Sequence, residues 1–345
     1  MEQKVKVLIV DDSALIRKLL TRALSTSDQI KVVGAAEDPL IASEMIKKYN
    51  PDVLTLDIEM PKMDGLTFLK NLMRLRPMSV VMVSALTKRG ATATLKALEY
   101  GAIDFVAKPD SDFRENLLAY SDILIEKVLS AAKANVDKSA DAVRGQTKKI
   151  SLKEKGNNNI EVITIGASNG GTEAIKAIIS VLPANLPPIV MAQHIPPVFS
   201  TSFAKRLNEC SEINIIEPTE RMPLLPGHAY LAPGDQHMVI SKVAGNLYLN
   251  IEHTEPVNRH RPSVDVLYNS VVKACGKKAI GILLTGMGAD GAKGLKLLKD
   301  QGAHTIAQDE VSSVVWGMPG TAVSIGAASE VLSLNKISKR LVSLI

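Results

Sequence analysis

Residues 5–14, VKVLIVDDSA, decide the fold of the first half of the chain. A mostly apolar run, Val5–Val10, is followed at once by two carboxylates, Asp11 and Asp12. Because the run has little polar alternation, it predicts a strand buried on both faces, as in a parallel sheet covered by helices on each side. Ligands collect at the carboxyl ends of such strands, so the sequence also predicts a polar site at that edge of the sheet.

Four further apolar runs repeat this pattern, and the segments between them have apolar residues at three- and four-residue intervals. These runs are Val32–Ala35, Val53–Leu56, Val80–Val83 and Ile103–Val106. Together they predict five βα units and a doubly wound, five-stranded parallel sheet. The last helix of this half, about Phe113 to Ala132, has a broad apolar stripe. Burial against more than its own sheet and a helix end that leads toward a linker explain this stripe equally well.

The charge of the chain is concentrated in its middle. The 345 residues carry a formal net charge of +5, and a chain of this length predicts two domains. Residues 1–125 hold 17 basic and 17 acidic side chains, residues 126–159 hold 8 and 4, and residues 160–345 hold 16 and 15. Because residues 133–159 also lose apolar periodicity, we expect domains at 1–125 and 160–345, joined by a helix end and a flexible basic linker at 126–159.

Composition excludes several classes of protein. No uncharged stretch approaches the ~20 apolar residues of a membrane span, and no secretory signal is visible, so we expect a cytoplasmic protein without membrane insertion. The two cysteines, Cys210 and Cys275, are too few for a disulfide framework and fit a reducing compartment. No helix-turn-helix pair or arginine-rich helix is visible, and 12 aromatic side chains offer little for base stacking, so we expect no nucleic-acid partner.

Polar side chains follow four of the five predicted strands of the first half. They are Asp11 and Asp12 after the first strand, Asp57 after the third, Ser84 after the fourth and Lys108 after the fifth. Clustered carboxylates repel one another unless a hard cation holds them, and Mg²⁺ takes oxygen ligands while leaving positions for phosphate oxygens. The cluster therefore predicts a phosphorylation site, with Asp57 as the nucleophile, Asp11 and Asp12 as metal ligands, and Ser84 and Lys108 facing the phosphate. A single aspartate at a strand end can instead cap a helix, which is the better interpretation of Asp38 and Asp64.

The first half resembles the receiver domain of two-component response regulators. The segments that carry the resemblance are VLIVDDS (7–13), LDIEMPKMDGL (56–66), VVMVSAL (80–86) and DFVAKP (104–109). The resemblance implies a flavodoxin-like fold and Mg²⁺-dependent transfer of a phosphoryl group from a histidine kinase to Asp57. It also implies a conformational switch at Ser84 and Phe105, where many receivers have tyrosine in place of the phenylalanine.

The second half predicts another α/β domain. Parallel strands are expected at Glu161–Ile165, Ile189–Gln193, Ala279–Leu284 and His304–Ala307. Antiparallel strands around Gly and Asn turns are expected at Ala229–Ala232, Met238–Ser241 and Leu247–Ile251. The expected domain is thus doubly wound and mostly parallel, with an antiparallel hairpin.

A serine, a histidine and an aspartate follow three of these strands. Ser168 lies in GASNG (166–170), a G-x-S-x-G segment that, on a tight turn from strand to helix, holds the serine hydroxyl at the sheet edge. His194 directly follows a strand and can reach the same edge, whereas His304 begins a strand; the histidines at 228, 237 and 253 lie around the hairpin and are expected at the surface. Asp290 is the candidate for the carboxylate that orients the imidazole, although it could merely cap the next helix. The order Ser, His, Asp disfavours an α/β-hydrolase, in which the acid precedes the histidine.

The second half resembles the catalytic domain of chemotaxis-specific protein-glutamate methylesterases, which in that family follows a receiver domain. The matching segments are IGASNGG (165–171), MAQHIPP (191–197), YLAPGDQHM (230–238), RHRPSVDVL (259–267), LLTGMGADGAKG (283–294) and VVWGMPG (314–320). The resemblance implies Ser168 as nucleophile, His194 as general base and acid, and Asp290 as orienting carboxylate, with no cofactor for the esterase reaction.

The same resemblance implies the substrate and its contacts. Chemotaxis receptors are the implied substrate, with demethylation of glutamate γ-methyl esters and deamidation of glutamines. Met287 and Asn169 are the implied oxyanion contacts, while His260 and Arg261 either meet the receptor or belong to a solvated basic loop. We hypothesise that the unphosphorylated receiver restrains the esterase. The alternative function is a response regulator whose second half binds protein or DNA without catalysis.

Overall fold

The computed structural model describes residues 4–108, 113–134, 149–150 and 159–345, and for residues 113–117 and 119 it describes the backbone alone. The chain divides into two compact units, Met1–Ala140 and Asp141–Ile345. Most of the expected linker, 135–148 and 151–158, lies outside the described residues. Among the helices that are described, none is both long and apolar enough to cross a membrane.

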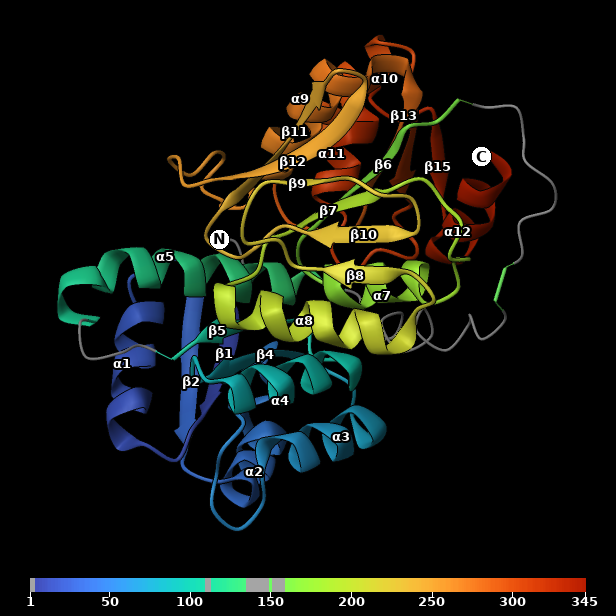
Figure 1. The fold of residues 1–345 in the computed structure, drawn as a ribbon. Helices are drawn as coiled ribbons and strands as arrows, with labels where there is room; N and C mark the ends of the chain where they lie inside the picture. The colour runs from blue at the N-terminus through green and yellow to red at the C-terminus, as the bar shows by residue number, and fades with distance from the viewer. Residues whose placement is uncertain (1–3, 109–112, 135–148, 151–158) are drawn as a thin grey trace. The chain divides into compact units, whose positions relative to one another are not determined.

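Strands and helices alternate in the first unit. In chain order they are β1 (Val5–Val10), α1 (Ala14–Leu24), β2 (Ile30–Ala36), α2 (Pro39–Tyr49), β3 (Val53–Asp57), α3 (Gly65–Leu75), β4 (Ser79–Ser84), α4 (Lys88–Glu99), β5 (Asp104–Ala107) and α5 (Phe113–Ala132). All five strands are parallel, in the order β2-β1-β3-β4-β5, which confirms the predicted doubly wound sheet. Helices α1 and α5 lie side by side on one face of the sheet (Figure 1).

Side-chain caps fix where several of these helices begin. The Asp38 carboxylate accepts hydrogen bonds of 2.9 Å from the backbone N–H groups of Leu40 and Ile41, at the start of α2. The Asp64 carboxylate does the same for the Thr67 N–H at 2.8 Å, at the start of α3. Such caps satisfy donors that have no partner inside the helix. The prediction that Asp38 and Asp64 cap helices is therefore confirmed.

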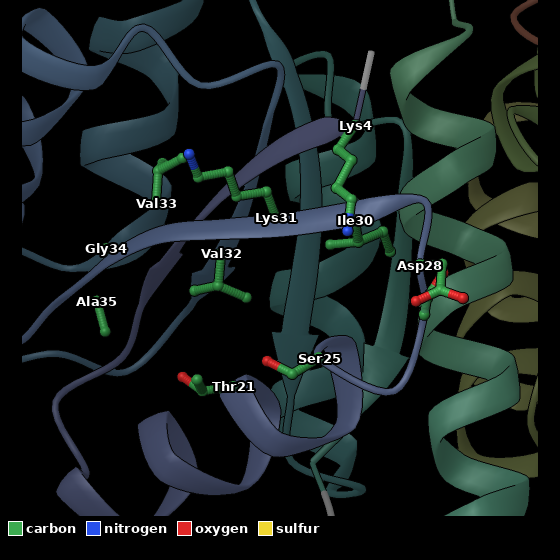
Figure 2. A pocket seen from close by; sticks show the side chains of 11 residues that line it. Lys4, Thr21, Ser25, Asp28, Ile30, Lys31, Val32, Val33, Gly34 and Ala35 are labelled. Carbon is green, nitrogen blue, oxygen red and sulfur yellow. The ribbon is translucent and has the colours of Figure 1, made fainter. Parts of the chain in front are cut away.

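The edge strand β2 borders an open hollow of about 530 Å³ (Figure 2). It is lined by Lys4, Thr21, Ser25, Ser27, Asp28, Ile30, Lys31, Val32, Val33, Gly34 and Ala35. None of the residues expected at the phosphorylation site lines it, so the hollow is separate from the carboxylate cluster.

The second unit is larger and has two sheets. Its elements are β6 (Val162–Ala167), α7 (Gly171–Ile179), β7 (Ile189–Gln193), α8 (Pro197–Cys210), β8 (Asn214–Ile216), β9 (Met222–Pro223), β10 (His228–Leu231), β11 (His237–Val243), β12 (Asn246–Glu252), α9 (Val264–Cys275), a 3₁₀ turn η1 (Gly276–Lys278), β13 (Ala279–Leu283), α10 (Ala292–Asp300), β14 (His304–Gln308), α11 (Met318–Ser324), β15 (Glu330–Leu332) and α12 (Leu334–Ser343). The main sheet is parallel, in the order β15-β14-β13-β6-β7-β10-β8, and a small antiparallel sheet has the order β11-β12-β9. The expected mostly parallel domain with an antiparallel hairpin is confirmed.

One strand differs from the prediction. Ala229–Ala232 was expected among the antiparallel strands, but β10 lies in the main sheet, parallel to β7 and β8. Ala229, Tyr230 and Leu231 are buried almost completely. A strand with no polar alternation is typical of the middle of a parallel sheet, which is the physical reason that β10 lies there.

Strand order places the carboxyl ends of three strands together. β6 lies between β7 and β13. The strand that follows β6 in the chain, β7, is added on one side of it, and the later strand β13 is added on the other side. In open α/β sheets, such a switch point leaves a crevice outside the carboxyl ends of the strands. In the first unit the corresponding point lies between β1 and β3. Each unit therefore has one sheet edge where a site is expected.

Candidate functional site

The switch point of the first unit holds a cluster of three carboxylates. Asp11, Asp12 and Asp57 each offer an oxygen, and these atoms all lie within 4.8 Å of one another. Asp11 and Asp57 are buried, whereas Asp12 is exposed. Oxygen ligands from carboxylates, with one side open to solvent, suit a hard divalent cation such as Mg²⁺, which keeps several waters. The residues present therefore fit the ion that the sequence implies.

Lys108 lies between the two buried carboxylates. Its Nζ is 3.0 Å from Asp11 Oδ2 and 2.8 Å from Asp57 Oδ2. Burial raises the pKa of Asp57 to about 6, and the neighbouring Asp11 adds to the rise, whereas Lys108 opposes it. Burial also raises the pKa of Asp11. Loss of hydration is thus the main cost of bringing these carboxylates together, and the Lys108 cation offsets part of it.

Ser84 and Phe105 are placed differently from Lys108. Ser84 ends β4 and accepts at its carbonyl a hydrogen bond of 2.7 Å from the Lys108 N–H. The Phe105 side chain is buried in the unit, with Lys127 Nζ 5.7 Å from its ring centre. The structure therefore brings Ser84 and Lys108 to one strand edge and directs Phe105 into the core.

The switch point of the second unit joins a serine, a histidine and an aspartate from three strands. Ser168 follows β6, His194 follows β7, and Asp290 lies in the loop after β13. His194 Nδ1 is 3.1 Å from Ser168 Oγ, and His194 Nε2 is 2.8 Å from Asp290 Oδ2. Since an ionised carboxylate only accepts, Nε2 carries the proton, which leaves the Nδ1 lone pair toward the serine hydroxyl. This arrangement can remove the proton of the Ser168 hydroxyl.

A tight turn holds the serine at the sheet edge. The Ser168 N–H donates to the Thr285 carbonyl at 3.0 Å, so the turn is tied to the neighbouring strand. Gly170, at the start of α7, has φ +73°, a conformation that side chains disfavour. A Cβ on Gly286 would lie 2.8 Å from Ser168 Cβ, so only glycine allows this close approach. These two glycines explain why the G-x-S-x-G segment forms the expected turn here.

Two residues, Gln193 and His260, contact His194. The Gln193 side-chain amide ties the two strand ends together, since its Nε2 donates to the carbonyls of Ser168 at 2.9 Å and His194 at 3.1 Å. The ring of His260 stacks on the ring of His194, with 3.6 Å between ring centres and 13° between planes. His260 therefore lies against the predicted base, at a distance typical of direct ring contact.

Asp290 accepts hydrogen bonds from five groups. The donors are His194 Nε2 (2.8 Å), the Val264 N–H (2.6 Å), Asn258 Nδ2 (2.7 Å), Ser263 Oγ (2.8 Å) and the Asp265 N–H (3.2 Å). Burial disfavours the ionised form, but these donors together hold the pKa of Asp290 below its usual range. Asp290 does not cap the helix that follows it, because Gly291 takes that position without a side-chain bond. It instead accepts from N–H groups in the first turn of α9, whose own N-cap is Ser263, so the alternative of a cap for its own helix is wrong.

The remaining sequence candidates divide into two groups. Asn169 Oδ1 is 3.1 Å from Ser168 Oγ, and the Met287 N–H has no acceptor among the described residues, although Met287 directly follows Gly286 beside the serine. Asn169 therefore contacts the serine, and Met287 is the next residue after the glycine that approaches it. The Arg261 guanidinium instead bonds Asp235 Oδ1 at 2.7 and 3.0 Å, and no hydrogen bond joins it to the triad within the described ranges.

Sequence reasoning missed part of the site. His237 was expected at the surface but is fully buried, and its Nδ1 accepts from the Ser263 N–H at 3.2 Å, next to Asp290. Gln193 and Asn258 also belong to the site and were not predicted. Gln193 precedes the predicted base, so its position was a usable signal, whereas nothing in the spacing of Asn258 points to Asp290.

Comparison with known proteins agrees with this arrangement of two units. Residues 7–118 match the response regulator receiver domain family, and residues 163–341 match the CheB methylesterase family. The chain is 53% identical over 342 residues to protein-glutamate methylesterase/protein-glutamine glutaminase 2 of Saccharophagus degradans, covering 98% of each chain. It is 49% identical over 343 residues to protein-glutamate methylesterase/protein-glutamine glutaminase of Salmonella typhimurium, covering 99% of this chain and 97% of that protein.

A solved structure resembles the second unit. The CheB methylesterase catalytic domain of Thermotoga maritima superposes with a TM-score of 0.53 at 36% sequence identity, covering 54% of this chain and 99% of that one.

Proposed function

This chain belongs to the CheB methylesterase family and carries a response regulator receiver domain before the catalytic domain, and from that premise we propose how its residues work. The protein is a chemotaxis protein-glutamate methylesterase and protein-glutamine glutaminase. The alternative of a non-catalytic output domain that binds protein or DNA is wrong, because the second half matches the methylesterase family. We propose domains at 1–125 and 160–345 with a helix end and linker at 126–159.

Ser168 is the proposed nucleophile, and the Ser168–His194–Asp290 hydrogen-bond chain is the observation that carries the proposal. Ser168 Oγ attacks the side-chain carbonyl carbon of a glutamate γ-methyl ester while His194 Nδ1 takes the hydroxyl proton. Methanol leaves with that proton, and water then hydrolyses the acyl-enzyme with His194 again as base. A glutamine amide has the same shape and releases ammonia by the same steps. Asp290 holds the imidazole in the Nε2–H form and stabilises the imidazolium.

The negative oxygen that forms on the substrate carbonyl needs donors. We assign this role to the Met287 N–H, which follows Gly286 beside Ser168, and to the backbone N–H groups of the turn at Asn169. The Asn169 side-chain oxygen is not such a donor, because it accepts from the Ser168 hydroxyl. Loss of one such donor typically lowers kcat by a factor of ~10²–10³. His260 covers one face of His194 and restricts its rotation. Arg261 shapes the same loop through Asp235, which favours a supporting role over receptor contact.

Asp57 is the proposed phosphate acceptor of the receiver domain. Asp11, Asp12 and Asp57 would hold Mg²⁺, whose charge offsets that of the incoming phosphate. Lys108, whose Nζ is beside Asp57, and Ser84, at the end of the next strand, would donate to the phosphate oxygens. Phe105 has no hydroxyl, so any switch that involves it works through packing. The phosphodonor is a chemotaxis histidine kinase.

Replacing Asp57 by asparagine should abolish phosphate incorporation and every increase in esterase rate that a phosphodonor causes. Asparagine cannot form the acyl phosphate, because its side chain has no carboxylate to attack the phosphorus. Methanol release would be measured with and without acetyl phosphate and Mg²⁺, and the two rates should be equal. Asp28→Asn, an exposed carboxylate before β2, serves as the matched control and should keep the increase. An Asp57→Asn protein that is still stimulated would contradict the assignment.

Removing residues 1–140 should raise the rate of the unphosphorylated protein by roughly 5- to 150-fold, the range of ordinary allosteric coupling. The cut is placed before Asp141 because Lys149 pairs with Glu212 and the Ile150 N–H donates to the Val181 carbonyl, so both residues belong with the catalytic unit. Methanol release by the two proteins at equal concentration measures the effect. An unchanged or lower rate would show that the receiver does not restrain the esterase.

The proposed substrate is a methyl-accepting chemotaxis receptor, as the names of the relatives and the receiver domain imply. We propose that the reaction takes place in the cytoplasm, which is supported by the two free cysteines, Cys210 and Cys275. Methanol release from methylated receptor, with and without phosphodonor, tests substrate and regulation together.

A further inference from the structure

A tight turn brings a second group of side chains to the triad. Val257 and His260 exchange backbone hydrogen bonds of 3.1 and 2.9 Å, and the two residues between them, Asn258 and Arg259, have φ of +54° and +69°. Positive φ at both central residues is typical of a type I′ turn, in which asparagine is favoured. The backbone therefore fixes where the Asn258 side chain can reach.

The Asn258 amide bridges two buried carboxylates. Its Nδ2 lies 2.7 Å from Asp290 Oδ1 and 2.9 Å from Asp265 Oδ2. Asp290 and Asp265 are 3% and 6% exposed, so neither carboxylate has bulk water to stabilise its charge. A side-chain amide nitrogen carries two hydrogens, one for each carboxylate. This neutral group serves both anions at once, which no single backbone N–H can do.

The two carboxylates are neighbours because each caps the helix of the other. Asp290 precedes α10 but accepts from the Val264 N–H of α9, while Asp265 in α9 accepts from the Gly294 N–H of α10 at 2.7 Å. This exchange stabilises both helix starts, yet it leaves two like charges separated by little more than the Asn258 amide. Nothing in the mechanism proposed above uses Asp265.

We propose that Asn258 is a positioning residue that acts through Asp290: its amide separates Asp290 from Asp265 and keeps the Asp290 carboxylate turned toward His194. The inference rests on the proposed function, since it assigns Asn258 a part in orienting the proposed base. Asn258 does not touch the reacting atoms. Its loss should therefore lower kcat and leave KM nearly unchanged.

The surroundings of the pair define the expected pH effect. The titratable groups that face it are His194 after β7, Tyr268 on α9, His237 through the Ser263 N–H, and His260 stacked on His194. Burial raises the pKa of Asp265, and Asp290 adds to the rise, whereas the Asn258 bond opposes it. Without the amide, both carboxylates bind protons more tightly, so the acid limb of kcat/KM should move to higher pH.

The test is Asn258→Gly, because glycine accepts the positive φ of the turn, so the whole side chain, including the amide, is removed without straining the backbone. Methanol release from methylated receptor should show kcat lowered roughly 10- to 100-fold at pH 7, KM within about twofold, and the acid limb at higher pH. Asn50→Gly is the matched control, since Asn50 has φ +45° at the end of α2 in the receiver domain, and it should keep the wild-type pH profile.

A second substitution separates positioning from a general loss of structure. In the Asn258→Gly background, Asp265→Asn removes the like charge and places an amide near Asp290, so it should restore at least tenfold of the lost kcat. No recovery, together with an unmoved pH profile, would overturn the proposal, and so would a rise in KM at unchanged kcat. Ser168→Ala is run alongside. If Ser168→Ala is active, the proposed function fails; if it is inactive while Asn258→Gly is normal, only this inference fails.

Discussion

Replacing Ser168 by alanine should lower kcat for hydrolysis of receptor glutamate methyl esters by about 10⁴- to 10⁶-fold. Ser168 Oγ is the only oxygen of the triad that can form the acyl-enzyme, and alanine leaves His194 with no hydroxyl to activate. Only the oxyanion donors and substrate binding then remain. These contributions alone typically accelerate the reaction ~10³- to 10⁴-fold over the uncatalysed rate. The measurement is methanol release under substrate saturation, with ammonia release from glutamine measured in parallel.

Both activities should fall together, because the ester and the amide share one nucleophile. Ser202→Ala is the matched control: Ser202 Oγ donates only to the Val198 carbonyl within α8, and its loss should change kcat less than twofold. Phosphorylation at Asp57 should be unaffected in the Ser168→Ala protein, which would show that the receiver domain is intact. Equal rates for wild type and Ser168→Ala on either substrate would refute the serine mechanism.

The sequence predicted the parts of the fold that depend on local pattern. Unbroken apolar runs such as Val5–Val10 and Ile189–Gln193 coincide with strands, and the polar residues after them lie at the carboxyl edges. Parallel topology then brings Ser168, His194 and Asp290 together without any further information, because neighbouring strand ends share an edge. The position of a triad on an open sheet is thus largely a consequence of hydrophobic pattern.

What the sequence did not predict depends on tertiary contacts. His237 begins a hairpin strand, where a histidine is usually exposed, but α9 packs on that strand and buries it. Asn258 reaches Asp290, 32 positions further along the chain, only because a positive-φ turn directs its side chain inward. Ser263 caps α9 from its own segment, but Asp290 also accepts from the Val264 and Asp265 N–H groups in the first turn of α9. Local capping rules cannot foresee this second acceptor from a distant loop.

Replacing Asp290 by asparagine should lower kcat by about 10⁴-fold, with little change in KM. The carboxylate accepts at both oxygens, from His194 and Val264 at Oδ2 and from Asn258, Ser263 and Asp265 at Oδ1, so it requires an acceptor on each side. Asparagine offers only one carbonyl oxygen. In either orientation of the amide, the asparagine NH₂ group therefore faces groups that are themselves hydrogen-bond donors.

The orientation of the asparagine amide decides the size of this effect, because the Val264 N–H lies at the Oδ2 position and the Asp265 N–H at the Oδ1 position. If the asparagine oxygen stays at the Oδ1 position, its NH₂ group faces His194 Nε2 and stabilises the tautomer protonated at Nδ1, which cannot accept the Ser168 proton. If the amide is reversed, its NH₂ group meets the Asn258 amide and the Asp265 N–H, and the loop holding residue 290 must shift. Asp300→Asn, an exposed carboxylate paired with Lys296, is the control and should leave methanol release unchanged. An Asp290→Asn protein that keeps a tenth of wild-type kcat would show that His194 is oriented by other contacts, of which the stacked His260 ring is the first to test.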